Sequence, residues 1–171
     1  MSRSSAVLVE VPEAEPVVGE WRRRHTYDGP LGVPPHVTLL FPFVPAERLT
    51  EDVEERLAGL LGIARAFDAA FARTARWPSL LYLEPQPSER FSALTEAIAA
   101  AWPEHPPYEG EFEVVIPHLT VVEAEARQFL DRVAADVEPH LPIETRVREA
   151  QLYVEDDAGR WREHRRLPLA E

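Results

Sequence analysis

Two five-residue segments, one in each half of the chain, carry the same pattern of side chains. They are Pro35–Leu39 and Pro117–Val121, and each consists of proline, histidine, an apolar residue, threonine and an apolar residue. Such alternation is typical of a strand, in which residues two positions apart share one face. Each segment is therefore predicted to present an imidazole and a hydroxyl on one face of a strand and two apolar side chains on the other.

The order of the predicted elements also repeats. The first half contains predicted strands at 6–11, 36–41 and 67–74 and predicted helices at 15–26 and 50–61. The second half contains predicted strands at 80–83, 113–122, 145–154 and 161–167 and predicted helices at 89–102 and 123–137. We therefore expect one domain over residues 1–171, built from two pseudo-symmetric lobes at about 1–79 and 80–171 between which strands can be exchanged.

Composition excludes several kinds of chemistry. The chain has no cysteine, and all 18 of its basic residues are arginine. This excludes a thiolate nucleophile, a cysteine-ligated metal, a lysine Schiff base and the lysine that an ATP-dependent ligase would adenylate. No G-x-S-x-G or H-E-x-x-H pattern is present either. Histidine and threonine remain as the reactive groups, and we expect neither a metal nor a cofactor.

Charge and hydropathy limit the partners. A formal net charge of −12 argues against a broad face for duplex nucleic acid, although a small anionic substrate can bind in a local cleft. No run of about 18 apolar residues is present, so no membrane span is predicted. Met1–Ser5 lacks the apolar run of a signal peptide. We expect a cytoplasmic monomer.

Two imidazoles that face each other across a cleft suit a reaction in which one proton is removed and another is supplied. In phosphodiester hydrolysis, a neutral histidine takes a proton from the attacking water, and a protonated histidine donates one to the leaving alkoxide. The ordinary histidine pKa of about 6.5 allows both roles. Threonine hydroxyls can donate hydrogen bonds to the phosphoryl oxygens. The candidate catalytic residues are His36, Thr38, His118 and Thr120.

The two His-x-Thr segments resemble the paired motifs of the two-histidine phosphoesterase superfamily, and within it those of the 2′-5′ RNA ligase-like branch. The resemblance implies an α+β fold in which two antiparallel sheets face a central cleft, with helices outside. It also implies metal-independent hydrolysis of a 2′,3′-cyclic phosphate of a nucleotide or RNA end, or of a related small cyclic phosphate. For opening to a 2′-phosphate, the family pattern makes His118 the base and His36 the acid, but the orientation of the substrate decides between them.

One stretch departs from the family pattern. A basic residue commonly follows the second motif closely, whereas here Val122–Glu125 contains two glutamates and the first arginine is Arg127. Acidic residues beside the cleft would repel a long RNA and favour a small cyclic phosphodiester. Two other functions stay open: a nucleotide-binding module without turnover, and 2′-5′ RNA ligation as a side activity through reversal of ring opening.

Four further residues are candidate substrate contacts. Phe41, Tyr82 and Tyr153 carry rings that can stack on a base, although aromatic residues on strands more often belong to the core. Arg148 is a candidate for holding a substrate phosphate. The run Arg22–Arg24 lies near a predicted helix end and is expected on a solvated face.

Overall fold

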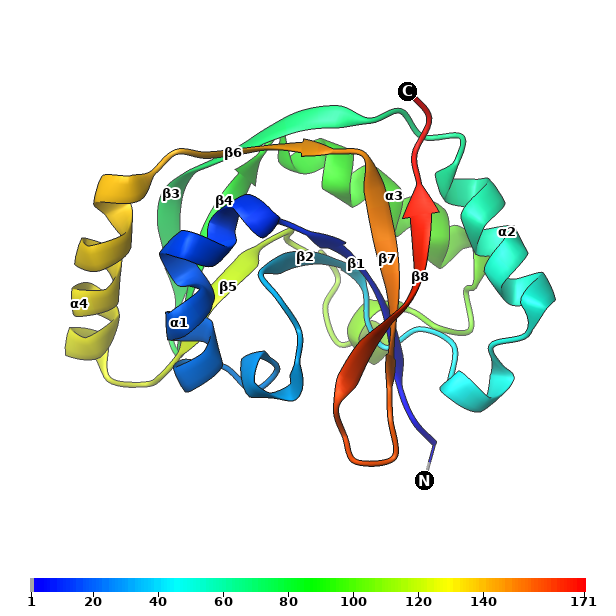
Figure 1. Ribbon diagram of the computed structural model, residues 1–171, viewed down its shortest axis with the longest axis horizontal. Coiled ribbons are helices and arrows are strands. Elements are labelled where there is room, and N and C mark those ends of the chain that lie inside the picture. The colour runs from blue at the N-terminus through cyan, green and yellow to red at the C-terminus, as the bar shows by residue number, and fades with distance from the viewer. Residues whose placement is uncertain (1) are drawn as a thin grey trace.

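The computed structural model describes residues 2–171 and contains two four-stranded antiparallel sheets (Figure 1). The first sheet has the strand order β2-β1-β7-β8, with β1 at Ser5–Glu10, β2 at His36–Leu40, β7 at Glu149–Glu155 and β8 at Trp161–Pro168. The second has the order β5-β4-β3-β6, with β3 at Phe67–Trp77, β4 at Leu80–Gln86, β5 at Leu119–Glu123 and β6 at Ile143–Val147. The α-helices are α1 at Glu15–His25, α2 at Glu51–Leu61, α3 at Ser88–Ala101 and α4 at Arg127–Val137.

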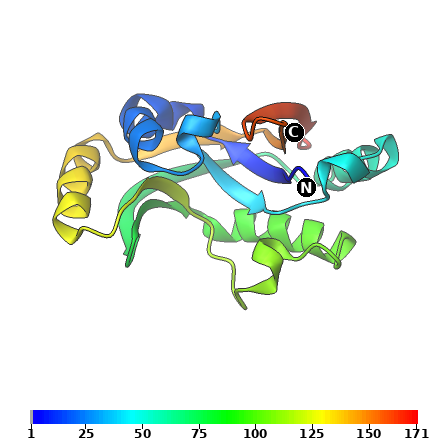
Figure 2. The ribbon, with the colours of Figure 1, turned by 90° about the horizontal axis from the view of Figure 1, so that it is seen from below.

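Each sheet combines strands from both halves of the chain. The first sheet pairs β1 with β7, and the second pairs β3 with β4. Figure 2 shows the two sheets as layers, with β1 (blue) and β8 (red) above the green segments β4 and α3. The motif strands β2 and β5 are the edge strands of their sheets, and they contact each other. This arrangement brings together two segments that are far apart in the sequence.

The helices pack across the two halves. Helix α1 lies against β5, while α3 lies against β2. Val18 of α1 and Phe91 and Ile98 of α3 are fully buried in the main core, so both helices bury an apolar face. The predicted fold class, two facing antiparallel sheets with helices outside, is confirmed.

Three predicted boundaries were wrong. The strand expected at 113–122 begins only at Leu119, because Pro117 has no N–H for a ladder and the residues before it lie outside both sheets. The strand expected at 145–154 is two strands, β6 and β7, which belong to different sheets and meet at Arg148. The helix expected from 123 begins at Arg127, because Glu123 still pairs with Leu80 in the sheet.

Across residues 2–171, no helix has both the length and the apolar character that crossing a membrane requires.

Candidate active site

The two motif strands place their polar side chains in one cavity of about 300 Å³ between the sheets. Val37 and Leu39 of β2, and Leu119 and Val121 of β5, point into the main core. The alternate side chains, those of the four candidate catalytic residues, line the cavity. The remaining lining residues are Ala6, Leu8, Tyr27, Asp28, Val33, Phe41, Leu80, Tyr108, Glu123 and Trp161.

The two histidine rings are held in the same way. His36 Nδ1 lies 2.7 Å from the carbonyl oxygen of Pro34, and His118 Nδ1 lies 2.7 Å from that of Ile116. A carbonyl oxygen only accepts hydrogen bonds, so in each neutral ring Nδ1 carries the proton and donates it. Nε2 is then the unprotonated nitrogen. His36 Nε2 accepts a hydrogen bond from the Thr38 hydroxyl at 3.1 Å.

Burial holds both rings neutral. It lowers the pKa of His36 to about 4, with the nearby Arg22 guanidinium acting in the same direction and the Asp28 carboxylate opposing it. Burial also lowers the pKa of His118. The two rings are close enough that a charge on His118 further lowers the pKa of His36. An anion bound between them would raise the pKa of both, and so favour the proton that a general acid needs.

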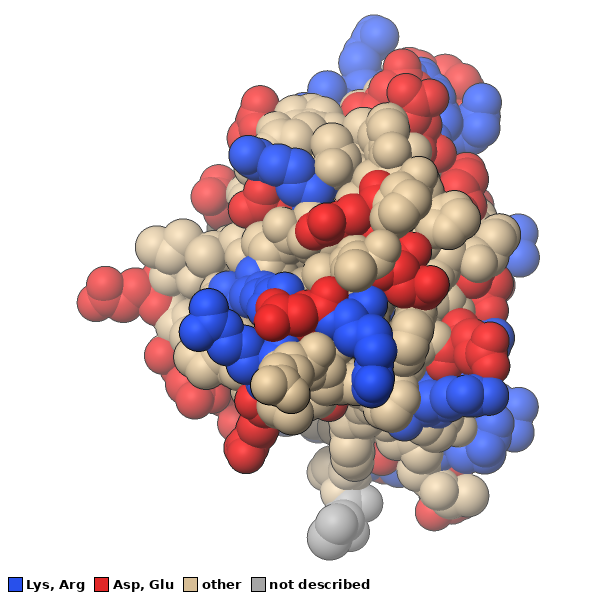
Figure 3. All heavy atoms as spheres, turned by 90° about the vertical axis from the view of Figure 1, so that its left-hand side faces the viewer, with Lys and Arg blue, Asp and Glu red and all other residues tan. Residues whose placement is uncertain are grey.

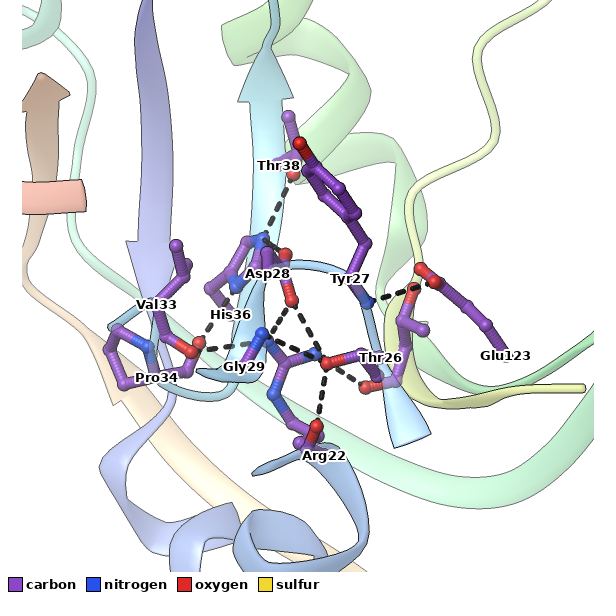
Figure 4. A network of polar contacts seen from close by, with 11 residues as sticks. Arg22, Thr26, Tyr27, Asp28, Gly29, Val33, Pro34, His36, Thr38 and Glu123 are labelled. Atoms are coloured by element: carbon purple, nitrogen blue, oxygen red, sulfur yellow. Dashed lines mark hydrogen bonds and ion pairs between the residues drawn. The ribbon is translucent and has the colours of Figure 1, made fainter. Parts of the chain in front are cut away.

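Arg22 connects the two motifs from inside the protein (Figure 4). Its guanidinium donates to the carbonyl oxygen of Thr120 at 2.8 Å, to Asp28 Oδ1 at 2.7 Å and to the carbonyl oxygen of Val33 at 3.2 Å. Arg22 is 1% exposed. The expectation that the run Arg22–Arg24 lies on a solvated face is therefore wrong for Arg22. The missed signal is helical spacing, because Arg22 follows the buried Val18 by one turn on the same face of α1.

Asp28 links Arg22 to the first histidine. Its Oδ1 accepts from Arg22, and its Oδ2 lies 3.8 Å from His36 Nε2. The Thr26 hydroxyl lies 3.2 Å from Oδ1 and also donates to the carbonyl oxygen of Arg22, so the turn after α1 is held rigidly (Figure 4). Sequence reasoning did not assign Asp28 to the site.

The four candidate substrate contacts lie in different places. Phe41 lines the cavity, with its ring edge-on to Trp161 at 5.9 Å. Tyr82 is buried, and its ring packs against His118 at 5.7 Å. Tyr153 is buried, and its hydroxyl donates to Glu10. Arg148 is exposed where β6 meets β7 and does not line the cavity.

Sequence reasoning placed Glu123 beside the cleft but missed three aromatic lining residues: Tyr27, Tyr108 and Trp161. Tyr108 adopts a left-handed backbone conformation, with φ 50°, and its N–H donates to the carbonyl oxygen of Phe41 at 2.6 Å. Burial raises the pKa of the Tyr108 phenol, while the neighbouring Thr38 hydroxyl opposes that rise. No short sequence pattern marks these three aromatic residues, because they come from three separate parts of the chain.

The cavity has an acidic and aromatic lining. It contains Asp28 and Glu123 but no arginine. Within residues 2–171, no group of three His, Asp or Glu side chains is arranged to hold a metal ion. On the face that carries α4, arginines and acidic residues are mixed and form no continuous basic surface (Figure 3). Elsewhere in the structure too, arginines pair with acidic residues, as Arg24 does with Glu20 and Arg76 with Asp131.

Two facing sheets, with a histidine and a threonine on each of two adjoining edge strands, define the class of two-histidine phosphoesterases. A model of the 2′-5′ RNA ligase superfamily matches residues 10–159, and the chain belongs to this family. By class it is a phosphoesterase.

Solved structures share the fold over the whole chain. LigT of E. coli in complex with 3′-AMP is 18% identical, with 100% of both chains covered and a TM-score of 0.62. LigT in complex with NADP+ is 20% identical, with 99% of both chains covered and a TM-score of 0.61. TT0787 of Thermus thermophilus is 21% identical, with 96% of this chain and 97% of that chain covered and a TM-score of 0.60. A search of curated protein sequences gave no significant match.

Proposed function

We propose that this protein hydrolyses a small cyclic phosphodiester, such as a nucleoside 2′,3′-cyclic phosphate, without a metal ion. The observation that carries the proposal is the pair of histidines in one cavity, each with Nδ1 bound to a backbone carbonyl, which leaves Nε2 as the nitrogen that can exchange a proton with the substrate. The same pair provides one group to accept a proton and one to donate a proton. That E. coli LigT binds 3′-AMP and NADP+ supports a nucleotide as the ligand.

For opening to a 2′-phosphate, we assign His118 as the base and His36 as the acid. The water oxygen forms a bond to phosphorus while its proton moves to His118 Nε2. The bond between phosphorus and the 3′-oxygen breaks, and that oxygen takes the proton from protonated His36 Nε2. The Thr38 and Thr120 hydroxyls donate to the phosphoryl oxygens, where negative charge increases. The products are a 2′-phosphate and a free 3′-hydroxyl.

In this scheme the proton on His36 comes from solvent, and the negative charge of the bound substrate favours its uptake. With both pKa values lowered, both rings are neutral in the free protein at neutral pH. A phosphodiester anion between them raises both pKa values, and Asp28, 3.8 Å from His36 Nε2, favours the imidazolium at His36. The bound substrate thus favours protonation of His36, the general acid of the reaction.

The test is turnover of adenosine 2′,3′-cyclic phosphate in EDTA by the wild type, His36→Ala and His118→Ala, with His140→Ala as an exposed control. We expect each active-site variant to lose about 100-fold or more in kcat, because general acid or base catalysis contributes about that much. Turnover that survives in both variants, or that EDTA abolishes, would contradict the mechanism. Calorimetry of the same nucleotide separates an enzyme from a binding module, which would bind without forming product.

A further inference from the structure

The candidate site has an unusual charge balance for a site that takes a phosphate. Its lining contains two carboxylates, Asp28 and Glu123, and two neutral histidines. The buried Arg22 lies outside the lining and pairs with Asp28 at 2.7 Å. The opposite charges of Arg22 and Asp28 largely cancel each other. Of the two lining carboxylates, Glu123 is the one that forms no ion pair within residues 2–171.

The structure holds Glu123 at the rim of the cavity. It is the last residue of β5, and its Oε2 accepts a hydrogen bond from the N–H of Tyr27 at 3.0 Å (Figure 4). Tyr27, the donor of that hydrogen bond, also lines the cavity and is 76% exposed. Glu123 therefore lines the cavity and is also exposed, as expected of a residue at the mouth of the cavity.

We infer that Glu123 is a specificity residue that restricts the substrate to a phosphodiester carrying one negative charge and an uncharged, hydroxyl-bearing remainder. The inference rests on the proposed function and deepens it. A nucleoside 2′,3′-cyclic phosphate with a free 5′-hydroxyl meets this requirement, and its hydroxyl can donate to the carboxylate. A 5′-phosphate or the 5′-phosphodiester of an RNA end brings further negative charge toward Glu123 and is repelled.

The experiment compares two substrates that differ only at the 5′ position: adenosine 2′,3′-cyclic phosphate and its 5′-phosphorylated form. The ratio of their kcat/KM values is measured for the wild type, Glu123→Gln and Glu123→Arg, at about 0.02 M and about 0.5 M salt, which differ strongly in screening. Glu123→Gln removes the charge but keeps an oxygen that accepts from Tyr27. The matched control is Glu125→Gln, which removes an exposed carboxylate two residues further along that does not line the cavity.

We expect the wild type to prefer the 5′-hydroxyl substrate by about tenfold or more at low salt. Glu123→Gln should reduce this ratio about five- to tenfold, the size of one partly screened interaction between charges at about 6–8 Å. Glu123→Arg should reduce it further, and Glu125→Gln should leave it unchanged. High salt should bring the wild-type ratio toward that of Glu123→Gln.

Two results would overturn the inference. One is a wild-type ratio near one. The other is a strong preference that neither Glu123 variant nor salt alters, which would mean that shape rather than charge excludes the 5′-phosphate. If the wild type turns over neither substrate, the proposed function fails separately. The dissociation constants of the same two nucleotides, measured by calorimetry, then test the charge selection, and equal values for both would overturn it.

Discussion

Replacing Arg22 should be the most damaging single change near the site. Its guanidinium makes three hydrogen bonds, to Asp28 and to the carbonyl oxygens of Val33 and Thr120, and it is almost fully buried. Arg22→Met leaves these three acceptors without their donor. Removing one partner of a buried, hydrogen-bonded ion pair costs about 3–5 kcal/mol. The gain from losing the unpartnered Nε–H of Arg22 offsets only part of this.

The assay is thermal and urea unfolding followed by circular dichroism. A loss of about 3–5 kcal/mol corresponds to a fall in Tm of about 6–20 °C for a chain of this size. Arg22→Lys keeps the charge, but its single ammonium group cannot reproduce the planar guanidinium, so it should fall between wild type and Arg22→Met. The control is Arg23→Met, which removes an exposed ion pair with Glu15 and should cost about 1 kcal/mol at most.

A second readout separates positioning from stability. Because the Arg22 guanidinium lowers the pKa of His36 while Asp28 raises it, Arg22→Met should raise that pKa. NMR titration of the His36 ring well below the Tm of the variant measures this. If Arg22→Met is no less stable than Arg23→Met, or if the pKa of His36 falls, our account of Arg22 is wrong.

Two further predictions concern charge at His36. Asp28→Asn removes the carboxylate that favours the imidazolium, so it should lower the pKa of His36 and move the alkaline limb of the kcat–pH profile to lower pH. If that limb stays in place or moves to higher pH, Asp28 has no part in the mechanism. The second prediction concerns stability. In the unfolded chain His36 is protonated below about pH 6.5, whereas in the folded protein it is protonated only below about pH 4. The contribution of His36 to the free energy of unfolding is therefore complete above pH 6.5 and falls by about 1.4 kcal/mol per pH unit below it. In urea unfolding, the wild type should lose about 2 kcal/mol more than His36→Gln between pH 7 and pH 5. Equal losses would contradict the lowered pKa.

The sequence predicts the parts of the fold that rest on local patterns. Alternation in Pro35–Leu39 and Pro117–Val121 correctly divides the apolar residues from those that line the cavity. The helical spacing of Val53, Leu57 and Leu61 correctly predicts α2, which Thr50 caps by accepting from the N–H of Val53. These signals lie within one turn or one strand, where neighbouring residues decide the conformation.

What the sequence does not show is which elements meet. The predicted strand at 145–154 has no visible break, yet the chain changes sheets at Arg148, because β6 pairs with β3 while β7 pairs with β1. The sequence predicts a solvated position for Arg22, and no pattern in it assigns Asp28 to the site. Their contacts come from the packing of α1 against β5, which brings Thr120 within hydrogen-bond distance of Arg22. Pairing between distant strands and helices leaves no mark in a short window of sequence.

The two motifs are nearly identical in sequence, but the surrounding residues make them chemically unequal. His36 is flanked by the Thr38 hydroxyl and by Asp28, so polar groups lie at its Nε2. His118 instead packs edge-on against Trp77 at 4.8 Å and lies beside Tyr82. A carboxylate favours the protonated ring, whereas an aromatic and apolar setting favours the neutral ring. We propose that, once a phosphate anion is bound, Asp28 and the anion together hold the proton on His36 against the opposing effects of burial and Arg22, and that His118 accepts a proton. A pseudo-symmetric fold can supply one acid and one base in this way without any difference in the reacting side chains.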